Sequence, residues 1–301
     1  MLISAVVLNW NGQEYIEDCL TSLSLLQTGD HQLKVIVVDN GSTDASVDLI
    51  KKKFPDSTLI ETRENLGYAE GNNVGIRLAL ENQSDYIWII NPDIKLAPDA
   101  LISLIHASAK NPQYGIFGSK IYFFPGFEFH KKDYAKKDLG KVIWYAGGLM
   151  DWKNLIANHR GVDQIDTGQY DDQKETDFVT GASMFIKSQV IRDVGLLDAK
   201  YFLYFEENDF CQGARKIGWR LLYVPESVAW HKNAQATGVG SPLQDYYIAR
   251  NRMLFGLRHA PIHTKLALVK ESLSLLSGGR PWQKQGIKDF YLGRFGKGSY
   301  A

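Results

Sequence analysis

The sequence predicts an α/β fold in which a mostly parallel, doubly wound sheet is followed by an α+β half and a helical C-terminal tail. In the first third, short β-branched runs such as residues 3–8 and 33–38 alternate with segments whose apolar residues recur at helical spacing. Runs of this kind suit strands that are buried on both faces, and their alternation with helices is typical of parallel sheets. In such sheets the ligand lies at the carboxyl ends of the strands.

The elements of the first third follow one another in a regular order. The first strand covers residues 2–8, and the helix after it is indicated by apolar positions on one helical face, namely Tyr15, Ile16, Cys19, Leu20, Leu23 and Leu26. After the strand at 33–38, Ser42 and Thr43 offer N-caps to a second helix that contains Val47 and Ile50. The series continues with a strand at 57–61, a helix at 68–81, a strand at 86–90 and a helix at 99–110.

This regularity fades beyond Gly115. Two aromatic segments, at 121–129 and 142–150, are predicted to be antiparallel strands separated by a lysine-rich turn at 130–141. The predicted elements after them are a strand at 178–186, a short helix, an acidic turn at 206–209, a strand at 219–224 and largely helical sequence from about Gln244. Because no repeat or low-complexity linker interrupts the chain, we divide it only by pattern, into residues 1–115, 116–240 and 241–301.

The composition excludes several classes of protein. Of the 301 residues, 45% are hydrophobic and 23% are charged, which is typical of a globular protein with a sizeable core. Thirty-four lysines and arginines balance thirty-four acidic residues, so no net field favours nucleic acid as a partner. The two cysteines, Cys19 and Cys211, fit buried helix positions and cannot build a disulfide framework or a four-thiolate metal site, which favours a reducing compartment.

The chain carries no targeting or spanning signal that these patterns reveal. No basic leader with a small-residue cleavage site precedes the first strand, and no apolar run approaches the roughly 18 residues of a membrane span. We therefore expect a cytoplasmic protein that is neither secreted by this route nor integral to a membrane. Its charge is nevertheless uneven, because ten basic residues from Arg250 onward stand against only Glu271 and Asp289.

Small polar residues follow each predicted strand of the first half. The groups are Asn9-Trp10-Asn11-Gly12, Asp39-Asn40-Gly41-Ser42-Thr43-Asp44, Asn65-Leu66-Gly67 and Asn91-Pro92-Asp93. Each group alone is an ordinary turn sequence. Together at one edge of a parallel sheet they predict a ligand site, because open α/β sheets bind their ligands at that edge.

The chemistry of these groups suits a diphosphate held by a cation. No glycine-rich phosphate loop of the Rossmann or Walker type follows the first strand, which disfavours a dehydrogenase or a nucleoside triphosphatase. A divalent cation on Asp93 can neutralise the phosphate instead, because a hard ion bridges a carboxylate and diphosphate oxygens. Asp39 ends its strand and is placed to accept a hydrogen bond from a base N–H.

Seven separated strings run in one order over nearly the whole chain: AVVLNWNG, VIVVDNGSTD, ENLGYAEGNNVGI, IINPDI, TGASMFIKSQVIRDVGLLDAKYFLYFEENDF, GWRLLYVPESVAWH and YYIARNRM. In these strings the sequence resembles the family 2 glycosyltransferases, specifically their rhamnosyltransferase-like branch. The resemblance implies the glycosyltransferase A fold, a nucleotide-sugar donor, a divalent cation (Mg²⁺ or Mn²⁺) and inversion at the anomeric carbon. It makes residues 1–240 a catalytic domain, with a nucleotide half at 1–115 and an acceptor half at 116–240, and 241–301 a helical basic region.

The resemblance also implies which residues bind the nucleotide sugar. Asn9 and Asn11 match the first-strand motif that flanks the base and ribose, and Asp39 matches the aspartate that reads the pyrimidine. The stretch that closes over the nucleotide contains Asn65, Gly67 and Asn72.

A metal motif and its partner follow from the same resemblance. Asn91 and Asp93 stand where the family has Asp-x-Asp or Asn-x-Asp, so Asp93 is the main acidic ligand and Asn91 replaces the first acid. His231 matches the position that often completes the metal site, with an ordinary histidine at a strand end as the alternative.

An acidic cluster corresponds to the family's general-base motif. Its members are Glu206, Glu207 and Asp209, and the second acid, Glu207, resembles the base that takes the proton of the acceptor hydroxyl. Neighbouring carboxylates raise one another's pKa, which suits a base. The alternative is an acidic run at a solvated helix start.

Some positions depart from the family or allow two interpretations. The family arginine after the acidic motif aligns with Gly213, and Arg215 is its candidate replacement. Arg250, in the string YYIARNRM, suits either a lid over the diphosphate or a basic helix face. The tryptophans Trp144, Trp152 and Trp230 suit either stacking on sugar rings or burial in the core.

The leading hypothesis is an inverting transferase that moves a sugar, rhamnose by the branch it resembles, from a dTDP- or UDP-sugar to a glycan or lipid-linked acceptor in cell-surface polysaccharide biosynthesis. One alternative is a catalytically silent nucleotide-sugar-binding module, favoured by Asn91 and Gly213. Another is a sugar nucleotidyltransferase, although no glycine- and lysine-rich activation loop follows the first strand. The apolar and basic residues from Pro261 onward favour either peripheral contact with the inner face of a membrane or a helical pair with a solvated basic face.

Overall fold

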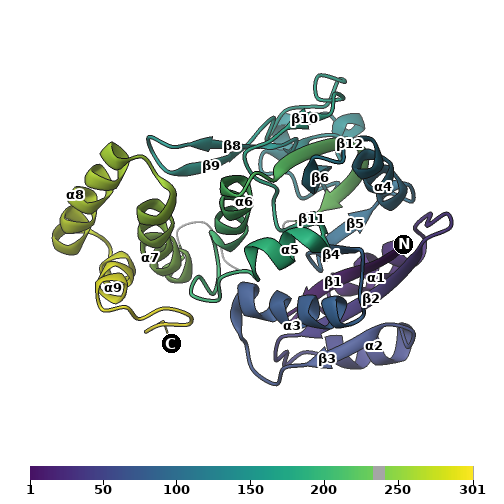
Figure 1. Cartoon of the computed structure of the whole chain (residues 1–301), viewed down its shortest axis with the longest axis horizontal. Coiled ribbons are helices and arrows are strands. Elements are labelled where there is room, and N and C mark those ends of the chain that lie inside the picture. Colours follow the sequence, from purple (N-terminus) through teal and green to yellow (C-terminus); the bar gives the residue numbers. More distant parts are fainter. Residues whose placement is uncertain (233–240, 301) are drawn as a thin grey trace.

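A ten-stranded sheet covered by helices forms the body of the protein (Figure 1). The computed structural model describes residues 1–232 and 241–300. The strands of the large sheet are β1 Leu2–Asn9, β2 Gln32–Asp39, β3 Thr58–Glu61, β4 Tyr86–Ile90, β5 Ile94–Leu96, β6 Tyr114–Phe123, β7 Ile143–Tyr145, β10 Lys174–Glu175, β11 Ser183–Lys187 and β12 Arg220–His231. A separate hairpin consists of β8 Gly148–Asp151 and β9 Ile156–His159.

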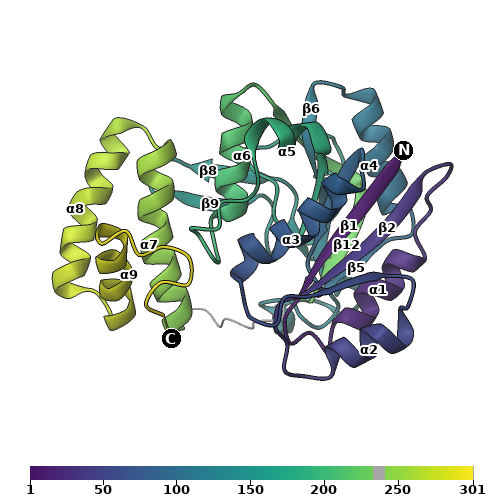
Figure 2. The same cartoon turned by 60° about the horizontal axis from the view of Figure 1, so that its bottom comes forward.

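The earlier helices in the chain accompany the large sheet, and the last three helices of the described residues lie apart from it. Those that accompany the sheet are α1 Ile16–Ser24, α2 Ser46–Lys53, α3 Gly67–Glu81, α4 Ala100–Lys110, α5 Ser188–Val194 and α6 Glu206–Lys216. Figure 2 shows α3 on one face of β1 and β2, and α1 and α2 on the other. The helices α7 Pro242–His259, α8 Ile262–Gly278 and α9 Pro281–Tyr291 form a layer of their own at the end of the molecule far from β3 (Figure 1).

The order of strands explains why the first half follows the simple pattern and the second does not. Along the main path the order is β10-β12-β6-β11-β4-β1-β2-β3. β1 pairs in parallel with β2 and β4, and β2 pairs in parallel with β3, as the alternating sequence predicts. β11 runs antiparallel between β4 and β6, while β12 is parallel to β6. The register of β1 and β2 places Asn9 beside Asp39 at the carboxyl ends of both strands.

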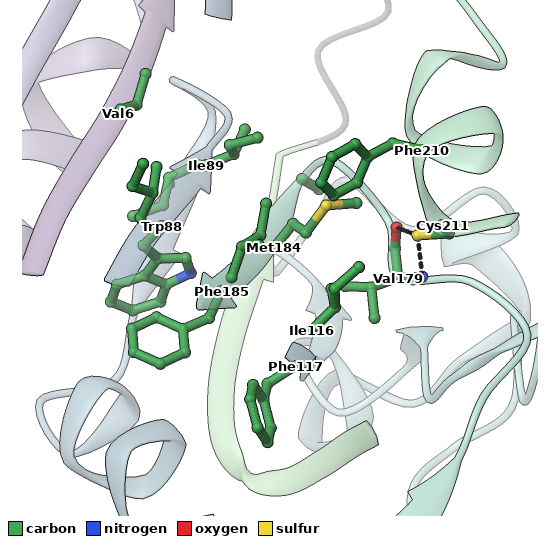
Figure 3. Close-up of a cluster of buried hydrophobic side chains, with 14 of the residues drawn as sticks. Val6, Trp88, Ile89, Ile116, Phe117, Val179, Met184, Phe185, Phe210 and Cys211 are labelled. Carbon is green, nitrogen blue, oxygen red and sulfur yellow. Dashed lines mark hydrogen bonds between the residues drawn. The ribbon is translucent and has the colours of Figure 1, made fainter. Parts of the chain in front are cut away.

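One core joins the two halves. Trp88 of β4 is fully buried, and its indole N–H donates a 3.0 Å hydrogen bond to Ser183 of β11. Phe185 lies edge-on to Trp88 and to Phe117 of β6, and Figure 3 shows Phe210 and Cys211 of α6 on the other side of Met184 from these rings. Because side chains of both halves fill the same interior, neither half has a hydrophobic core separate from the other.

Several predicted boundaries in the second half are wrong. β6 ends at Phe123, and the segment predicted as one strand at 142–150 is divided into β7 and β8 at Gly147, whose φ is +104°. The predicted strand at 178–186 begins only at Ser183, and the acidic turn at 206–209 is the first turn of α6. β12 continues to His231 because the irregularity in its pairing between Val224 and Val228 accommodates Pro225, which has no N–H for the ladder.

The prediction that the two cysteines occupy buried helix positions is confirmed. Cys19 in α1 and Cys211 in α6 are free and buried. The helices of the C-terminal layer begin at residues suited to helix starts, since Ser241 accepts a hydrogen bond from the Gln244 N–H and Pro242 occupies the first turn of α7. No helix within the described residues is both long enough and apolar enough to span a membrane.

Candidate active site

A cleft of about 710 Å³ opens at the carboxyl ends of the parallel strands. Five of the residues predicted from sequence line it, namely Asn11, Asn65, Gly67, Asn91 and Asp93. Trp10, at the mouth of the cleft, is 44% exposed and also lines it. The sequence places Trp10 in a strand-end group, but it gives no signal that this indole, rather than Trp144, Trp152 or Trp230, faces the ligand side.

The first two strand-end loops are joined by hydrogen bonds. The Asn9 amide donates to Asp39 Oδ1 at 2.9 Å and to Ser46 Oγ at 2.9 Å, and the Ser42 N–H donates to Asp39 Oδ2 at 3.1 Å. Asn9 is fully buried and does not line the cleft, so its contact with the nucleotide stays a prediction that its position does not support. Its role in the structure is to hold Asp39, because all of its amide donors point at side chains of the protein.

Ser42 and Thr43 connect to Asn11 instead of capping α2. The Asn11 N–H donates to Ser42 Oγ at 2.9 Å, and Asn11 Oδ1 accepts from the Thr43 N–H at 2.8 Å. The N-cap position of α2 is Ala45, so the predicted caps are wrong. Asp39 lines a second hollow of about 350 Å³ with Ser42 and Thr43, and Asp44 borders both this hollow and the cleft.

The third strand-end loop is tied to Asn40. The Asn40 amide donates to Asn65 Oδ1 at 3.1 Å and to the Gly67 carbonyl at 3.2 Å, while Asn40 Oδ1 accepts from the Leu66 N–H at 3.0 Å. Gly67 has a φ of +81°, and a Cβ there would come within 2.5 Å of Phe202, so only glycine fits. Asn72 is fully buried and donates to the Tyr68 carbonyl, so its place over the nucleotide stays a prediction that its position does not support.

A histidine and a carboxylate face each other at the predicted metal position. His231 Nε2 lies 3.1 Å from Asp93 Oδ1, and the two side chains are only 7% and 10% exposed. His231 ends β12, where it stands opposite Ile94 of β5 in the antiparallel pairing. Trp144 packs edge-on to the His231 ring at 4.4 Å and fixes its orientation from the other side.

These two side chains fit a divalent cation. Imidazole nitrogen and carboxylate oxygen are ligands of Mn²⁺-type ions, and both point at one spot beside the cleft. Within residues 1–232 and 241–300 no group of three or more His, Cys, Asp or Glu side chains could hold a metal by itself. The remaining ligands of such an ion would therefore come from the substrate or from water. The Asn91 side-chain carbonyl oxygen is engaged by the Tyr68 hydroxyl at 3.0 Å.

The described part of the cleft contains no lysine or arginine among its lining residues. The nearby Lys232 is not among these lining residues, and its ammonium is paired with Asp18 at 2.7 Å and lies 5.9 Å from the centre of the Tyr15 ring. A diphosphate in the cleft consequently has a carboxylate next to it and no basic side chain of the described residues to balance its charge. This arrangement suits a site in which a cation supplies the positive charge.

Glu206 and Glu207 are the first two residues of α6, and the backbone just before them is strained. Phe202, Tyr204 and Phe205 all have positive φ, between +62° and +74°. Each glutamate has one carboxylate oxygen that is buried without a hydrogen-bond partner. Burial raises the pKa of Glu207, and burial together with the charge of Glu207 raises the pKa of Glu206. A carboxylate with a raised pKa and one oxygen without a hydrogen-bond partner is suited to accepting a proton.

Glu207 borders a pocket of about 330 Å³ on the side of α6 that faces the β8–β9 hairpin. The pocket walls are mostly apolar, with Leu155, Ile156, Ala157, Phe178, Phe205 and Ile248. Polar groups are supplied by Glu207, His159 and Arg252. Burial lowers the pKa of His159 to about 4, so this ring is neutral near pH 7 and its Nδ1 donates to the Trp144 carbonyl at 3.0 Å.

Tyr68 lies near both Asp93 and the two glutamates of α6, and the sequence interpretation does not name it as a site residue. Its hydroxyl is 3.0 Å from Asn91 Oδ1 and 2.8 Å from the Gly181 carbonyl oxygen. Burial, followed by the charges of Glu206, Glu207 and Asp93, raises the pKa of Tyr68, which places its hydroxyl within the field of both acidic sites. A tyrosine in the string NLGYAEG gives no sequence signal for this position beyond its place at the start of a helix.

Asp209 belongs to a different cluster from the two glutamates. Its carboxylate accepts hydrogen bonds from Arg258, from His259 at 2.7 Å and from the Tyr201 hydroxyl at 2.9 Å. Burial alone would raise its pKa, but the His259 hydrogen bond and the Arg258 charge lower it below its ordinary value. These partners tie α6 to α7 and occupy the Asp209 carboxylate, so its catalytic role stays a prediction that the structure does not support.

The position of the Arg250 side chain does not fit the predicted contact with the diphosphate. Its side chain is fully buried, and its guanidinium donates to backbone carbonyls of Tyr201 at 2.9 Å and Gly296 at 2.7 Å. These bonds fasten the C-terminal segment and the loop before α6 to α7, so the group cannot reach a diphosphate. Arg215, the candidate replacement for the family arginine, pairs with Asp177 at 2.9 Å and does not line the cleft.

The three tryptophans proposed for sugar stacking have protein partners. Trp152 stacks on Phe255 with the ring centres 6.0 Å apart, and Trp230 donates to the Gly140 carbonyl at 3.0 Å. Trp144 contacts His231 and His159, so it supports the site without lining the cleft.

The fold and this site place the protein among the sugar transferases. The chain belongs to glycosyl transferase family 2, whose family model matches residues 4–193. It has the α/β glycosyltransferase A fold and is an enzyme of this family, rhamnosyltransferase-like as the sequence resemblance implies.

Similar proteins agree with this membership. An N-acetylglucosaminyl-diphospho-decaprenol L-rhamnosyltransferase of Mycobacterium tuberculosis is 23% identical over 245 residues, which cover 79% of this chain and 78% of that protein. The low-salt glycan biosynthesis hexosyltransferase Agl10 of Haloferax volcanii is 25% identical over 256 residues, covering 84% and 74%. The crystal structure of GalNAc-T7 with UDP, GalNAc and Mn²⁺ superposes with a TM-score of 0.60 at 13% identity, and the match covers 94% of this chain and 58% of that chain.

Proposed function

We propose that this enzyme transfers a sugar, rhamnose by its resemblance, from a dTDP- or UDP-sugar to a hydroxyl of a lipid-linked or polysaccharide acceptor, with inversion at the anomeric carbon. The observation that carries the proposal is the pairing of Asp93 with His231 beside a cleft without a described basic side chain. Such a cleft is suited to a diphosphate only together with a cation. A silent binding module would need the same donor site. An enzyme needs a general base in addition, and Glu206 and Glu207 are the acidic pair that could supply it.

The donor side of the site is built on the parallel strand ends. Asp39 is held by Asn9 and Ser42, and its carboxylate is placed to accept a base N–H in the hollow beside Asp44. Asn11, Asn65 and Gly67 line the cleft, and Asp44 borders both the cleft and this hollow. We propose that the pyrimidine and ribose lie here and that the diphosphate lies toward Asp93.

Asp93 and His231 would hold the divalent cation, Mg²⁺ or Mn²⁺. Bound there with the donor, the cation would supply the positive charge that stabilises the leaving diphosphate. Asn91 contributes by positioning, since its side-chain carbonyl oxygen is fixed by the Tyr68 hydroxyl. The rest of the reaction is assigned to side chains of the chain itself.

Glu207 is the proposed general base. As the acceptor oxygen attacks the anomeric carbon, its proton passes to the Glu207 carboxylate, the bond from that carbon to the diphosphate oxygen breaks, and the nucleoside diphosphate leaves with the bonding electrons. One displacement of this kind inverts the anomeric carbon. The unpartnered oxygen and the raised pKa of Glu207 support this role, because both favour taking up a proton.

The pocket beside Glu207 is the proposed acceptor site. Its apolar walls suit the carbon face of a sugar or the start of a lipid chain, while His159 and Arg252 offer hydrogen bonds at its edge. The Mycobacterium tuberculosis relative is named for a diphospho-decaprenol acceptor, which supports a lipid-linked acceptor for this chain as well. An enzyme with such an acceptor would work at the inner face of a membrane as a peripheral, cytoplasmic protein.

Donor turnover tests the proposal. Purified enzyme is mixed with Mn²⁺, a soluble acceptor analogue carrying a diphosphate-linked sugar, and each member of a panel of dTDP-, UDP- and GDP-sugars, and the release of free nucleoside diphosphate is measured. We expect release with one pyrimidine donor and only when the acceptor is present. Binding of a donor, seen as a raised melting temperature, without any release would support the silent binding module instead.

A further inference from the structure

One strip along the exposed side of α8 is apolar. Ile262, Leu266 and Leu273 are 71%, 67% and 58% exposed, and Val269 on the same side is partly exposed. Leu276 continues this row and packs partly against the hydrophobic core. We call these five residues the α8 stripe. They are spaced by four, three, four and three positions, so they lie on one side of the helix over its whole length.

The opposite side of α8 is already used for packing. Thr264, Leu268 and Ser272 are buried, and the Ser272 hydroxyl lies 2.7 Å from the Tyr291 hydroxyl of α9. Leu268 packs so closely on α7 that a Cβ on Gly256 would come within 2.5 Å of it. The orientation of α8 is therefore fixed by its neighbours α7 and α9, and the exposed residues of the stripe lie away from that packing. Figure 1 shows α8 at one end of the molecule, beside α7 and α9.

The charges beside the α8 stripe indicate whether it binds a second copy of the chain or a lipid surface. The helix positions that flank the stripe carry His263, Lys265 and Lys270, and neither lysine pairs with a carboxylate within the described ranges. The single acid of α8, Glu271, lies away from the stripe and is paired with Arg252 at 2.7 Å. A second copy docked stripe to stripe would bring like-charged lysines together, which disfavours a coiled-coil contact. A surface of anionic lipid headgroups would instead pair with them.

We propose that α8 lies in the headgroup region of an anionic bilayer, with the α8 stripe against the acyl boundary and Lys265 and Lys270 among the headgroups. A helix with an apolar side and flanking cations binds lipid in this way without spanning the membrane. The residues that bind lipid are thus a subset of the apolar residues of the tail, since Leu268 faces the protein.

The position of α8 also connects the lipid surface with the proposed acceptor pocket. Arg252 of α7 pairs with Glu271 of α8, donates to the Asn154 carbonyl of the β8–β9 hairpin at 3.0 Å, and lines the pocket that Glu207 borders. The α8 stripe lies on the other side of α8 from this ion pair, so α8 stands between the proposed lipid surface and this wall of the pocket. This consequence rests on the proposed function, whereas the lipid contact itself does not.

Vesicle co-sedimentation with a matched pair of variants tests the lipid contact. The variant Leu266→Glu/Leu273→Glu removes the α8 stripe, and Leu25→Glu/Ile217→Glu is the control because these exposed residues, 66% and 55% accessible, lie outside the C-terminal helices. We expect wild type and control to pellet with phosphatidylglycerol-containing vesicles at low salt, to be released by salt, and to stay in solution with phosphatidylcholine alone. The stripe variant should bind at least tenfold more weakly while keeping its melting temperature.

Two results would overturn the proposal. One is binding of the stripe variant equal to that of the control. The other is a wild-type protein that ignores anionic vesicles and sediments as a dimer which the stripe variant breaks, because the α8 stripe would then be a contact between copies. Turnover of the soluble acceptor analogue should be unchanged in the stripe variant, so loss of vesicle binding and failure of the proposed sugar transfer are measured separately.

Discussion

Nε2 of His231 lies 3.1 Å from the Asp93 carboxylate, although 138 positions separate the two residues in the chain. The pairing of β12 with β5 brings them together, since β5 begins directly after Asp93 and His231 is the last residue of β12. A histidine this far along the chain can be tied to the carboxylate only through the sheet. The acceptor half thereby contributes one of the two side chains proposed to hold the cation.

Replacement of Glu207 tests the general base. Glu207→Gln keeps the size of the side chain but removes the proton acceptor, so we expect kcat to fall by at least about a hundredfold while donor binding is retained. Turnover and donor-induced thermal shift are measured on the same preparations. Glu206→Gln is the matched control, and a larger loss of kcat in that variant would assign the base to Glu206.

The pH dependence of turnover follows from the raised pKa of Glu207. Only the ionised carboxylate accepts a proton, so kcat should fall as the pH decreases through this pKa, at a pH above the ordinary value of 4.5. In Glu207→Gln this acid limb should be absent from the residual activity. Melting curves over the same pH range separate the limb from acid unfolding. An acid limb at or below pH 4.5 would contradict the assignment.

Glu206 should limit stability at neutral pH. Burial and the charge of Glu207 raise its pKa in the folded state, so the folded protein favours the protonated form. The corresponding stabilisation is present below the unfolded pKa and is lost as the pH rises through the folded pKa, by about 1.4 kcal/mol for each pH unit between these two pKa values. Glu206→Gln should therefore melt at a higher temperature than wild type at pH 7, with a difference that shrinks at acidic pH. An equal melting temperature at both pH values would show that Glu206 is not destabilised.

Asp209 should matter for folding more than for chemistry. Asp209→Asn leaves Arg258 and His259 without their shared anion, and loss of such a partly buried partner costs about 3 kcal/mol. Chemical denaturation measures this loss, and turnover per folded molecule should stay near the wild-type value. Normal stability combined with lost turnover would restore the catalytic role expected from the sequence.

The nucleotide half was predictable because its signals are local. Buried β-branched runs such as those of β1 and β4 can form only strands covered on both faces, and the predicted strand at 86–90 matches β4. In the second half, Pro225 resembles a strand end in the sequence, yet an irregularity in the pairing with β6 lets β12 continue to His231. Whether a strand continues past such a proline depends on its pairing with the neighbouring strand, and the sequence alone does not show that pairing.

The sequence predicts which segments of the chain form the candidate site, but it predicts less well which way their side chains point. Asn9, Asn72 and Arg250 lie in the predicted regions, but their side chains point into the protein and hold loops together. Conversely, Asn40 and Tyr68 join the site through hydrogen bonds to residues distant in sequence. An asparagine after a strand suits either role, because the amide group can bind a ligand or a neighbouring loop equally well.

Dependence of nucleoside-diphosphate release on a divalent cation held by Asp93 is the most direct test of the account. Release is measured for wild type with Mn²⁺, with EDTA, and after Mn²⁺ is restored, and for Asp93→Ala beside the control Asp30→Ala, an exposed aspartate before β2 at the opposite edge of the sheet. We expect EDTA to abolish release, Mn²⁺ to restore it, and Asp93→Ala to lose at least about a hundredfold while remaining folded. Full release by wild type in EDTA, or by Asp93→Ala with Mn²⁺, would contradict it.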